Sequence, residues 1–316
     1  MADTSNPLVR RRAAVGLAIE TTSGTAVAVS AALTATDVFD ASCEPVDLFS
    51  QTERRPHGQF NSRIKAPVGM RVGRFRFTIN LSYGSALTSN QILMRLLGYA
   101  LDTGVYKPVT AFGSRPKTFS MALQQDGRQH NLYGCVADCT IEIEVGKIAK
   151  ANFDGMGVWS STTDVALVTQ SQATTMPWTG TNMAVTVANG AGTPTEIGAC
   201  NKATIRFGNQ IAPREDFTVT PGVHYFYIAD RSPSIVLEPE ARLVATFDHF
   251  GDMLASGERA INIELDNGTN TLDFDAPKAQ RTNITYSERE NRHIDVLEFA
   301  CNANAGDDEL TVTASA

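Results

Sequence analysis

The sequence lacks long apolar runs and paired cysteines. No stretch approaches the ~20 apolar residues that a helix needs to cross a bilayer. Its cysteines form an odd, scattered set: Cys43, Cys135, Cys139, Cys200 and Cys301. This pattern argues against a disulfide framework and indicates a reducing compartment. The closest pair, Cys135 and Cys139, has no second pair at zinc-finger spacing, so no metal site is expected.

Catalytic motifs are also missing. The five histidines are dispersed over 316 residues, with no His-Glu-x-x-His helix and no Gly-x-Ser-x-Gly elbow. The sequence therefore predicts neither an enzyme nor a bound cofactor. Positive charge is in deficit, because 27 Lys and Arg stand against 34 Asp and Glu. This balance argues against a general affinity for nucleic acid, since phosphate binding takes clustered Lys and Arg.

The N-terminal region has the composition of an export signal but lacks its continuity. An arginine cluster precedes an alanine-rich run. Glu20 interrupts the apolar run, and no clean cleavage site follows directly. The cytoplasm is favoured over export.

What the chain does contain is short alternating strands. Residues 73–83 place Phe75, Phe77 and Ile79 on one side and polar residues on the other. Residues 140–145 and 260–266 alternate in the same way, with acids on the polar side. An ordinary solvated sheet face explains this pattern as well as a cavity or channel does. The candidate set for a cavity or channel is Arg74, Arg76, Thr78, Asn80, Ser82, Thr140, Glu142, Glu144, Asn262, Glu264 and Asp266.

Only two segments have helical spacing of apolar residues. Residues 89–100 carry one apolar stripe, and residues 240–257 carry another through Leu243, Phe247, Phe250, Met253 and Leu254. We expect both stripes to pack against the sheets.

The two helices indicate a duplication. A shift of 157 positions places Cys43 on Cys200 and Leu93 on Phe250, and the order strand, helix, strand, hairpin recurs. At 316 residues the chain also exceeds the usual size of one core. The expected organisation is an arm (1–29), a first domain (30–160), a Ser/Thr-rich linker (161–180) and a second domain (181–316).

Several segments, taken in order, resemble one family. They include "GLAIETTSGTAVA", "ILMRLLGYA", "IRFGNQIAPRED", "LEPEARL", "DAPKAQ" and the closing "AGDDELTVT". Together they resemble the tail tube proteins, or major tail proteins, of long-tailed bacteriophages with non-contractile tails. Such a resemblance implies a structural virion protein that assembles in the host cytoplasm and forms the channel for DNA ejection.

The fold implied by the resemblance is mainly β (α+β), with two tandem tail-tube-like β-sandwich or split-barrel units, each flanked by one helix. Strands of neighbouring subunits would close into one β-barrel, and rings would stack into a tube. Because the chain holds two units, three copies would make a ring of six. The alternative is a hexamer whose second half is a decoration. Contacts between rings are expected at Arg10, Arg11, Arg12, Glu53, Arg54, Arg55 and Phe60.

The implied partners are further copies of the chain, the tape measure protein, the tail terminator and the distal tail or tip proteins. Double-stranded DNA would pass through without specific binding, and the acids on the strands would repel its phosphates. Arg74 and Arg76 do not fit a purely acidic lining. The rival interpretations are another self-assembling virion component, such as a head-decoration protein, and an exported β-rich binding module.

Overall fold

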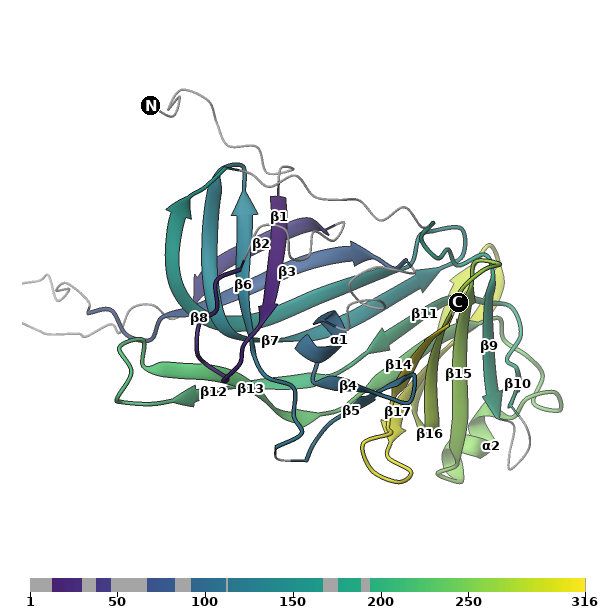
Figure 1. Ribbon diagram of the computed structural model, residues 1–316. Coiled ribbons are helices and arrows are strands. Elements are labelled where there is room, and N and C mark those ends of the chain that lie inside the picture. The colour runs from purple at the N-terminus through teal and green to yellow at the C-terminus, as the bar shows by residue number, and fades with distance from the viewer. Residues whose placement is uncertain are drawn as a thin grey trace, which may run out of the picture.

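The computed structural model describes residues 13–29, 38–46, 67–82, 92–111, 113–166, 176–188 and 194–315. Strands dominate these residues: a large antiparallel sheet runs through both halves of the chain, beside a separate two-stranded sheet (Figure 1). This confirms the mainly β prediction. We call residues 13–166 the first unit and residues 176–315 the second unit.

The first unit contains six strands in its main pattern, one helix and the hairpin β4–β5. Its elements are β1 (Ala13–Ile19), β2 (Val38–Val46), β3 (Val72–Asn80), α1 (Ile92–Leu96), β4 (Tyr99–Asp102), β5 (Val105–Pro108), β6 (Phe119–Gln125), β7 (Arg128–Glu144) and β8 (Lys150–Asp164). Strand β5 of this hairpin pairs with β18 (Thr311–Ser315) of the second unit.

The second unit repeats this order with additions. Its elements are β9 (Met183–Ala188), β10 (Pro194–Glu196), β11 (Cys200–Arg206), β12 (Asn209–Glu215), β13 (Val223–Arg231), β14 (Ser234–Pro239), α2 (His249–Leu254), β15 (Glu258–Asp266), β16 (Thr271–Arg289), β17 (Arg292–Asn302) and β18 (Thr311–Ser315).

The strand pairing of one unit matches that of the other. In the first unit, neighbouring strands follow the order β2, β3, β8, β7, β6, β1. In the second they follow β11, β14, β17, β16, β15, β9. The helices occupy matching places too, since α1 follows β3 and α2 follows β14. Position in this pattern therefore relates six strands of the first unit to six strands of the second.

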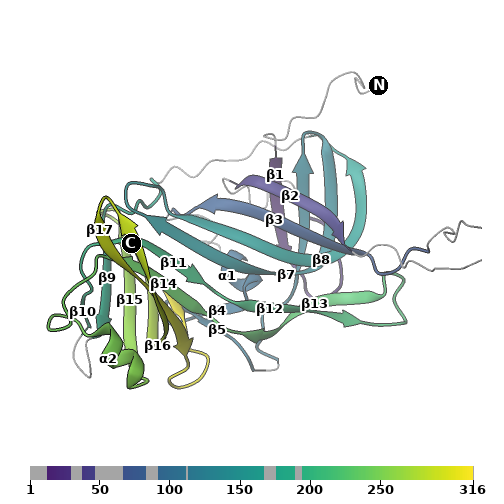
Figure 2. The same cartoon turned by 180° about the vertical axis from the view of Figure 1, so that it is seen from behind.

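Two strand pairs join the units: a long one between β7 and β11, and a short one between β5 and β18. Thr140 lies opposite Arg206 at one end of the β7·β11 ladder, and Glu144 lies opposite Lys202 at the other end. This ladder makes the two sheets one, as the continuous run of β8, β7, β11 and β14 in Figure 2 shows.

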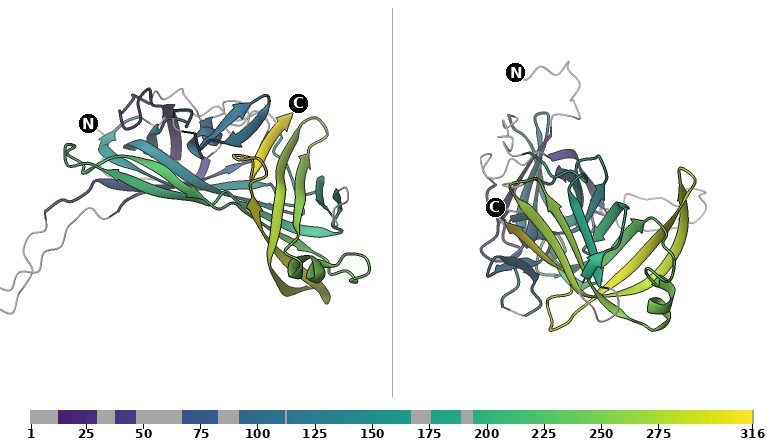
Figure 3. Two further views of the ribbon diagram at one scale, coloured as in Figure 1. Left: turned by 90° about the horizontal axis from the view of Figure 1, so that it is seen from below. Right: turned by 90° about the vertical axis from the view of Figure 1, so that its right-hand side faces the viewer.

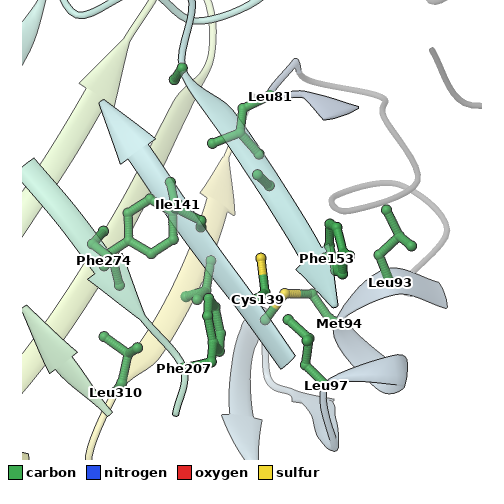
Figure 4. Close-up of a cluster of buried hydrophobic side chains, with 14 of the residues drawn as sticks. Leu81, Leu93, Met94, Leu97, Cys139, Ile141, Phe153, Phe207, Phe274 and Leu310 are labelled. Carbon is green, nitrogen blue, oxygen red and sulfur yellow. The ribbon is translucent and has the colours of Figure 1, made fainter. Parts of the chain in front are cut away.

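The core fills the space behind this sheet. Phe75, Phe77 and Phe153 stack there with ring centroids 6.2 Å and 4.8 Å apart along the row. Figure 4 shows α1 side chains pointing into the same cluster as Phe207 and Leu310 of the second unit. Both units thus share one apolar cluster, and its burial from water is the main stabilising term.

Two segments expected to be an arm and a linker contain paired or buried residues. The expected arm includes β1, which pairs with β6 and buries Val15 and Leu17. The expected linker includes the end of β8 and the fully buried Trp178, whose indole donates to the Asn270 carbonyl. Apolar side chains at these positions pack into the core, which composition alone does not reveal.

Both helices are shorter than predicted. Within the described residues, α1 ends at Leu96 because Gly98, at φ +80°, turns the chain into β4. Before α2 the chain forms turns, and Asp248 caps the helix through the Gly251 N–H. The expected core stripe of α2 is also wrong in part, because Leu243, Phe250 and Leu254 are exposed.

Candidate functional site: a polar sheet face and two unpaired strand edges

The side of β3 away from the core is polar, as the alternation predicts. Phe75, Phe77 and Ile79 are at most 2% exposed, which turns Arg74, Arg76, Thr78 and Asn80 to the other face. Ser82 lies beyond the end of β3. It is buried beside Pro177, with which it forms an isolated bridge, so it does not lie on the open part of this face.

β8 supplies the partners of these side chains. Arg74 and Arg76 both donate to the carboxylate of Asp154, Arg76 through Nε at 3.1 Å. Thr78 donates to Asn152 Oδ1 at 2.9 Å. Partial burial opposes ionisation of Asp154, but the hydrogen bonds from the two arginines outweigh it and lower the pKa of this carboxyl.

β7 continues the same face. Its register sets Thr140 opposite Asn152 and Glu142 opposite Lys150 on β8. Glu144 accepts a hydrogen bond from Lys147 at 2.8 Å, and this bond lowers the pKa of Glu144. The structure thus brings the predicted residues of β3 and β7 together on one face.

The face extends into the second unit with paired charges. Lys202 on β11 lies opposite Glu144 and 3.8 Å from Glu238 on β14. Arg206 lies 3.8 Å from Glu298 on β17. Basic and acidic side chains of neighbouring strands therefore lie near one another, and the face is close to charge balance rather than acidic.

The predicted residues on β15 lie elsewhere. Asn262 lies opposite Asp275 of β16, and Glu264 lies opposite Asp273 of β16. Asp266 is the last residue of β15. In the sheet order, β15 is many strands away from β3. Figure 3 shows β15 and β16 running steeply across the direction of β7. Burial, with Glu264 and Asp275 nearby, raises the pKa of Asp273 to about 6.

A folded hairpin covers one end of the polar face. β12 and β13 form the separate two-stranded sheet, and Val223 and Phe226 pack on Val136 and Val158 of the first unit. The sequence gives a signal for these contacts, since Val136 and Val158 are apolar residues at positions where the alternation expects polar ones. The contact of these two valines with the β12–β13 hairpin was not among the predictions from the sequence.

Two strand edges in this face have no strand partner among the described residues. β2 stands at the end of the strand order, paired with β3 alone. The last part of β16, from Arg281 to Arg289, pairs with β17 on one side and with no described strand on the other. Tyr286 in this part is 64% exposed. Unpaired edges of this kind are sites for pairing with another chain.

The predicted inter-ring residues cannot be placed on this surface. Arg10, Arg11, Arg12, Glu53, Arg54, Arg55 and Phe60 lie outside the described residues. Within the described ranges, no group of His, Cys, Asp and Glu side chains has the arrangement of a metal site. The same ranges hold no helix with the length and apolarity for a membrane span.

Comparison with known proteins identifies the family. No curated protein matches the chain. A family model described as phage tail tube protein matches residues 10–313, which is nearly the whole chain. The chain therefore belongs to the phage tail tube protein family and is a structural component of the virion tail.

Proposed function

We propose that the chain forms stacked rings in which β2 of one copy pairs with the last part of β16 of its neighbour. The observation that carries this proposal is an asymmetry between matching strands. β7 pairs with β6 along its first part and with β11 along its last part. β16 pairs with β15 along its first part, yet its last part lacks the matching partner.

The missing partner follows from the repeated pairing order. β11 begins the ladder of the second unit, and β2 begins the ladder of the first. Since β11 occupies the last part of β7, β2 of a second copy is the strand that fits the last part of β16. Such pairing extends the sheet of one chain into the next and removes both exposed edges.

Repetition of this contact closes a ring. Each chain supplies two units with boundaries near 30–160 and 181–316, so three copies give six units around one axis. The sheet then becomes a barrel whose inner wall is the polar face of β3, β8, β7 and β11. Stacked rings form the tube for DNA ejection, joined to tape measure, terminator and tip proteins, after assembly in the host cytoplasm.

The charge pattern of this wall suits the passage of DNA. DNA adheres to proteins when unpaired Lys and Arg side chains displace counterions from its phosphates. Arg74 and Arg76 are already paired with Asp154, and Lys150 stands opposite Glu142. A charge-balanced wall therefore replaces the acidic lining expected from the strands, and low adhesion follows from pairing rather than from repulsion.

Two neighbouring proline substitutions test the edge contact. In a strand, the N–H groups of adjacent residues point to opposite edges. One of Thr285→Pro and Tyr286→Pro therefore removes a donor from the free edge, and the other damages the ladder with β17. The edge variant is the one that keeps the wild-type melting temperature.

We expect the edge variant to remain monomeric in sedimentation at concentrations where the wild type forms rings or hollow rods in negative-stain images. Thr282→Ala, on an exposed side chain of the same strand, is the control and should assemble. Tubes formed by both proline variants would refute the proposed edge contact.

A further inference from the structure

Apolar side chains gather around α2 without a covering layer. Leu243 and Val244 in the preceding turn are 79% and 60% exposed, and Phe250 and Leu254 of the helix are 42% and 82% exposed. Tyr286 on β16 joins them, with its ring 6.4 Å from that of Phe250. We call these five residues the α2 patch. Figure 2 shows α2 in front of the lower part of β15 and β16.

The helix that carries the patch is held firmly. Asp248 accepts from the Gly251 N–H at 2.7 Å, and Arg259 Nε donates to Asp252 at 2.8 Å. The buried Arg281 donates to the His249 carbonyl at 2.7 Å and lies over the ring of Phe299. The exposure of the patch is thus a property of a fixed surface. Large apolar groups clustered on such a surface mark contacts with a partner.

The matching helix of the first unit is covered. Leu93, Met94 and Leu96 of α1, and Leu97 directly after it, are at most 1% exposed. Part of their cover comes from the second unit, as Figure 4 shows for Phe207 beside Leu97.

The covering residues all follow β11 in sequence. Phe207 packs edge-on against Tyr99 at 5.2 Å, next to the end of α1. Asn209 Nδ2 donates to the Leu97 carbonyl at 3.1 Å. Ile228 on β13 lies so close to Gly98 that a Cβ at this glycine would meet it at 2.7 Å. The unit that pairs with β7 therefore also seals α1.

We infer that the α2 patch is the seat of a second copy of the chain, whose first unit covers α2 with residues that follow β2. This inference rests on the proposed ring contact, because the unit that pairs with β16 is the one that seals α2. Tyr286 links the two surfaces, since it belongs both to the patch and to the unpaired part of β16.

The sequence after β2 supports this occupant. Leu48-Phe49-Ser50 follows β2, and Arg206-Phe207-Gly208 ends and follows β11. An aromatic residue thus stands shortly after each ladder-opening strand, and in the second unit it is the residue that packs beside α1.

The test places charge on the patch without touching the core. Leu243→Asp/Leu254→Asp changes two side chains that are about four-fifths exposed, so the monomer should keep its melting temperature. Assembly would bury both carboxylates in an apolar contact. We expect the assembled fraction in sedimentation to fall at least tenfold relative to wild type. Met176→Asp, at an 80% exposed residue away from the patch, should assemble normally.

Two further measurements keep the test decisive. If the double variant is destabilised, Leu254→Ser replaces it, and a wild-type assembled fraction in that variant also counts against the inference. In wild-type tubes, backbone amides of α2 should exchange more slowly with deuterium than in monomers. Phe49→Asp in the other half of the contact should reproduce the assembly defect.

The outcomes separate this inference from the proposed function. Normal tubes from the double variant, with the β16 proline variant still monomeric, would overturn the α2 contact and leave the ring proposal intact. Tubes from the proline variant, or a wild type that never forms rings, would overturn the ring proposal itself.

Discussion

Asp154 is the residue that neutralises the polar face of the first unit. It accepts hydrogen bonds from both Arg74 and Arg76, and all three side chains are about half exposed. Ion pairs at that exposure contribute at most about 1 kcal/mol to stability. Their effect on nucleic acid binding is larger, because a freed arginine can displace counterions from a phosphate.

We expect Asp154→Asn to bind double-stranded DNA several-fold more tightly than wild type at low salt, with the gain lost as salt rises. Fluorescence anisotropy across a salt series measures this. Asp102→Asn frees Lys107 on the β4–β5 hairpin, away from the face, and should change affinity less. An unchanged salt profile for Asp154→Asn would contradict the role assigned to its two ion pairs.

Asp273 on β16 makes the stability of the folded protein depend on pH. Burial first, and then Glu264 and Asp275, raise its pKa from 3.8 to about 6. The folded state therefore binds this proton more tightly than the unfolded state, and Asp273 adds stability as pH falls from about 6 toward 4. Above pH 6 the carboxylate of Asp273 is ionised in the folded state, and its partly buried charge lowers the free energy of unfolding.

Asp273→Asn should stabilise the protein at pH 7.5 by an amount on the order of 1 kcal/mol, once the pKa shift is discounted for solvent screening. Below pH 4 the gain should vanish, because both side chains are then neutral. Urea unfolding at both pH values measures the difference. Glu264→Gln removes one cause of the shift and should reduce the pH dependence. A gain of equal size at both pH values would show that ionisation is not its source.

Side-chain direction was largely predictable at this scale. The period of two placed Arg74, Thr78, Glu142 and Glu144 on the polar side of their strands, as the structure has them. The partners were not predictable, since Asp154 and Lys202 enter through pairing between strands far apart in sequence. Without the pairing, acids on β7 gave the impression of an acidic surface.

The hairpin β12–β13 is the element that locks the two units together. Phe226 is 1% exposed in the cluster with Val136, Val158 and Val72, whereas its neighbour Tyr227 is 38% exposed on the other side of the strand. Truncation of a buried Phe costs about 3–5 kcal/mol.

Phe226→Ala should therefore lower the free energy of unfolding by about 3 kcal/mol. It should also speed proteolysis of the hairpin in the native state, because the hairpin loses its main anchor. Tyr227→Ala is the matched control and should cost less than about 1 kcal/mol. Equal losses in the two variants would mean that the hairpin is not docked through this face.

Element lengths were less predictable than element order. The pattern for the helix at residues 240–257 counted Leu243 and Leu254 as core residues, but both lie on the surface. Apolar periodicity reports that a face will be covered and does not say by which chain. The two-stranded β12–β13 sheet was also missed, because its contacts belong to the other unit.

The whole molecule consists of two units that share one sheet and one core. The β7·β11 ladder and the β12–β13 hairpin both cross from one unit to the other. Separation would expose the last part of β7 and the strand β11 at once, and exposed edges promote aggregation.

Fragments 1–170 and 171–316 should therefore be poorly soluble when made alone and should copurify when coexpressed. Affinity capture of a tag on one fragment, with the other detected by mass, measures this. Ile205→Asp in the second fragment disrupts a fully buried position of β11 and should abolish copurification. Two separately soluble, monomeric fragments would contradict a shared sheet.

Class and duplication were readable from the sequence at this largest scale. The alternating strands and the two helices near Leu93 and Phe250 indicated them before any coordinates. The connection between the units was not readable, because no local pattern marks which strand of one unit meets Thr140–Glu144 of the other.

The β7·β11 ladder has one last consequence. Because both strands belong to one chain, this strand pair forms during folding of a single molecule, and its formation does not depend on protein concentration. In the proposed ring of three chains, every second ladder between units forms within one chain in this way. Only the three ladders between chains require the encounter of separate molecules. Dilution then weakens only the ladders between chains.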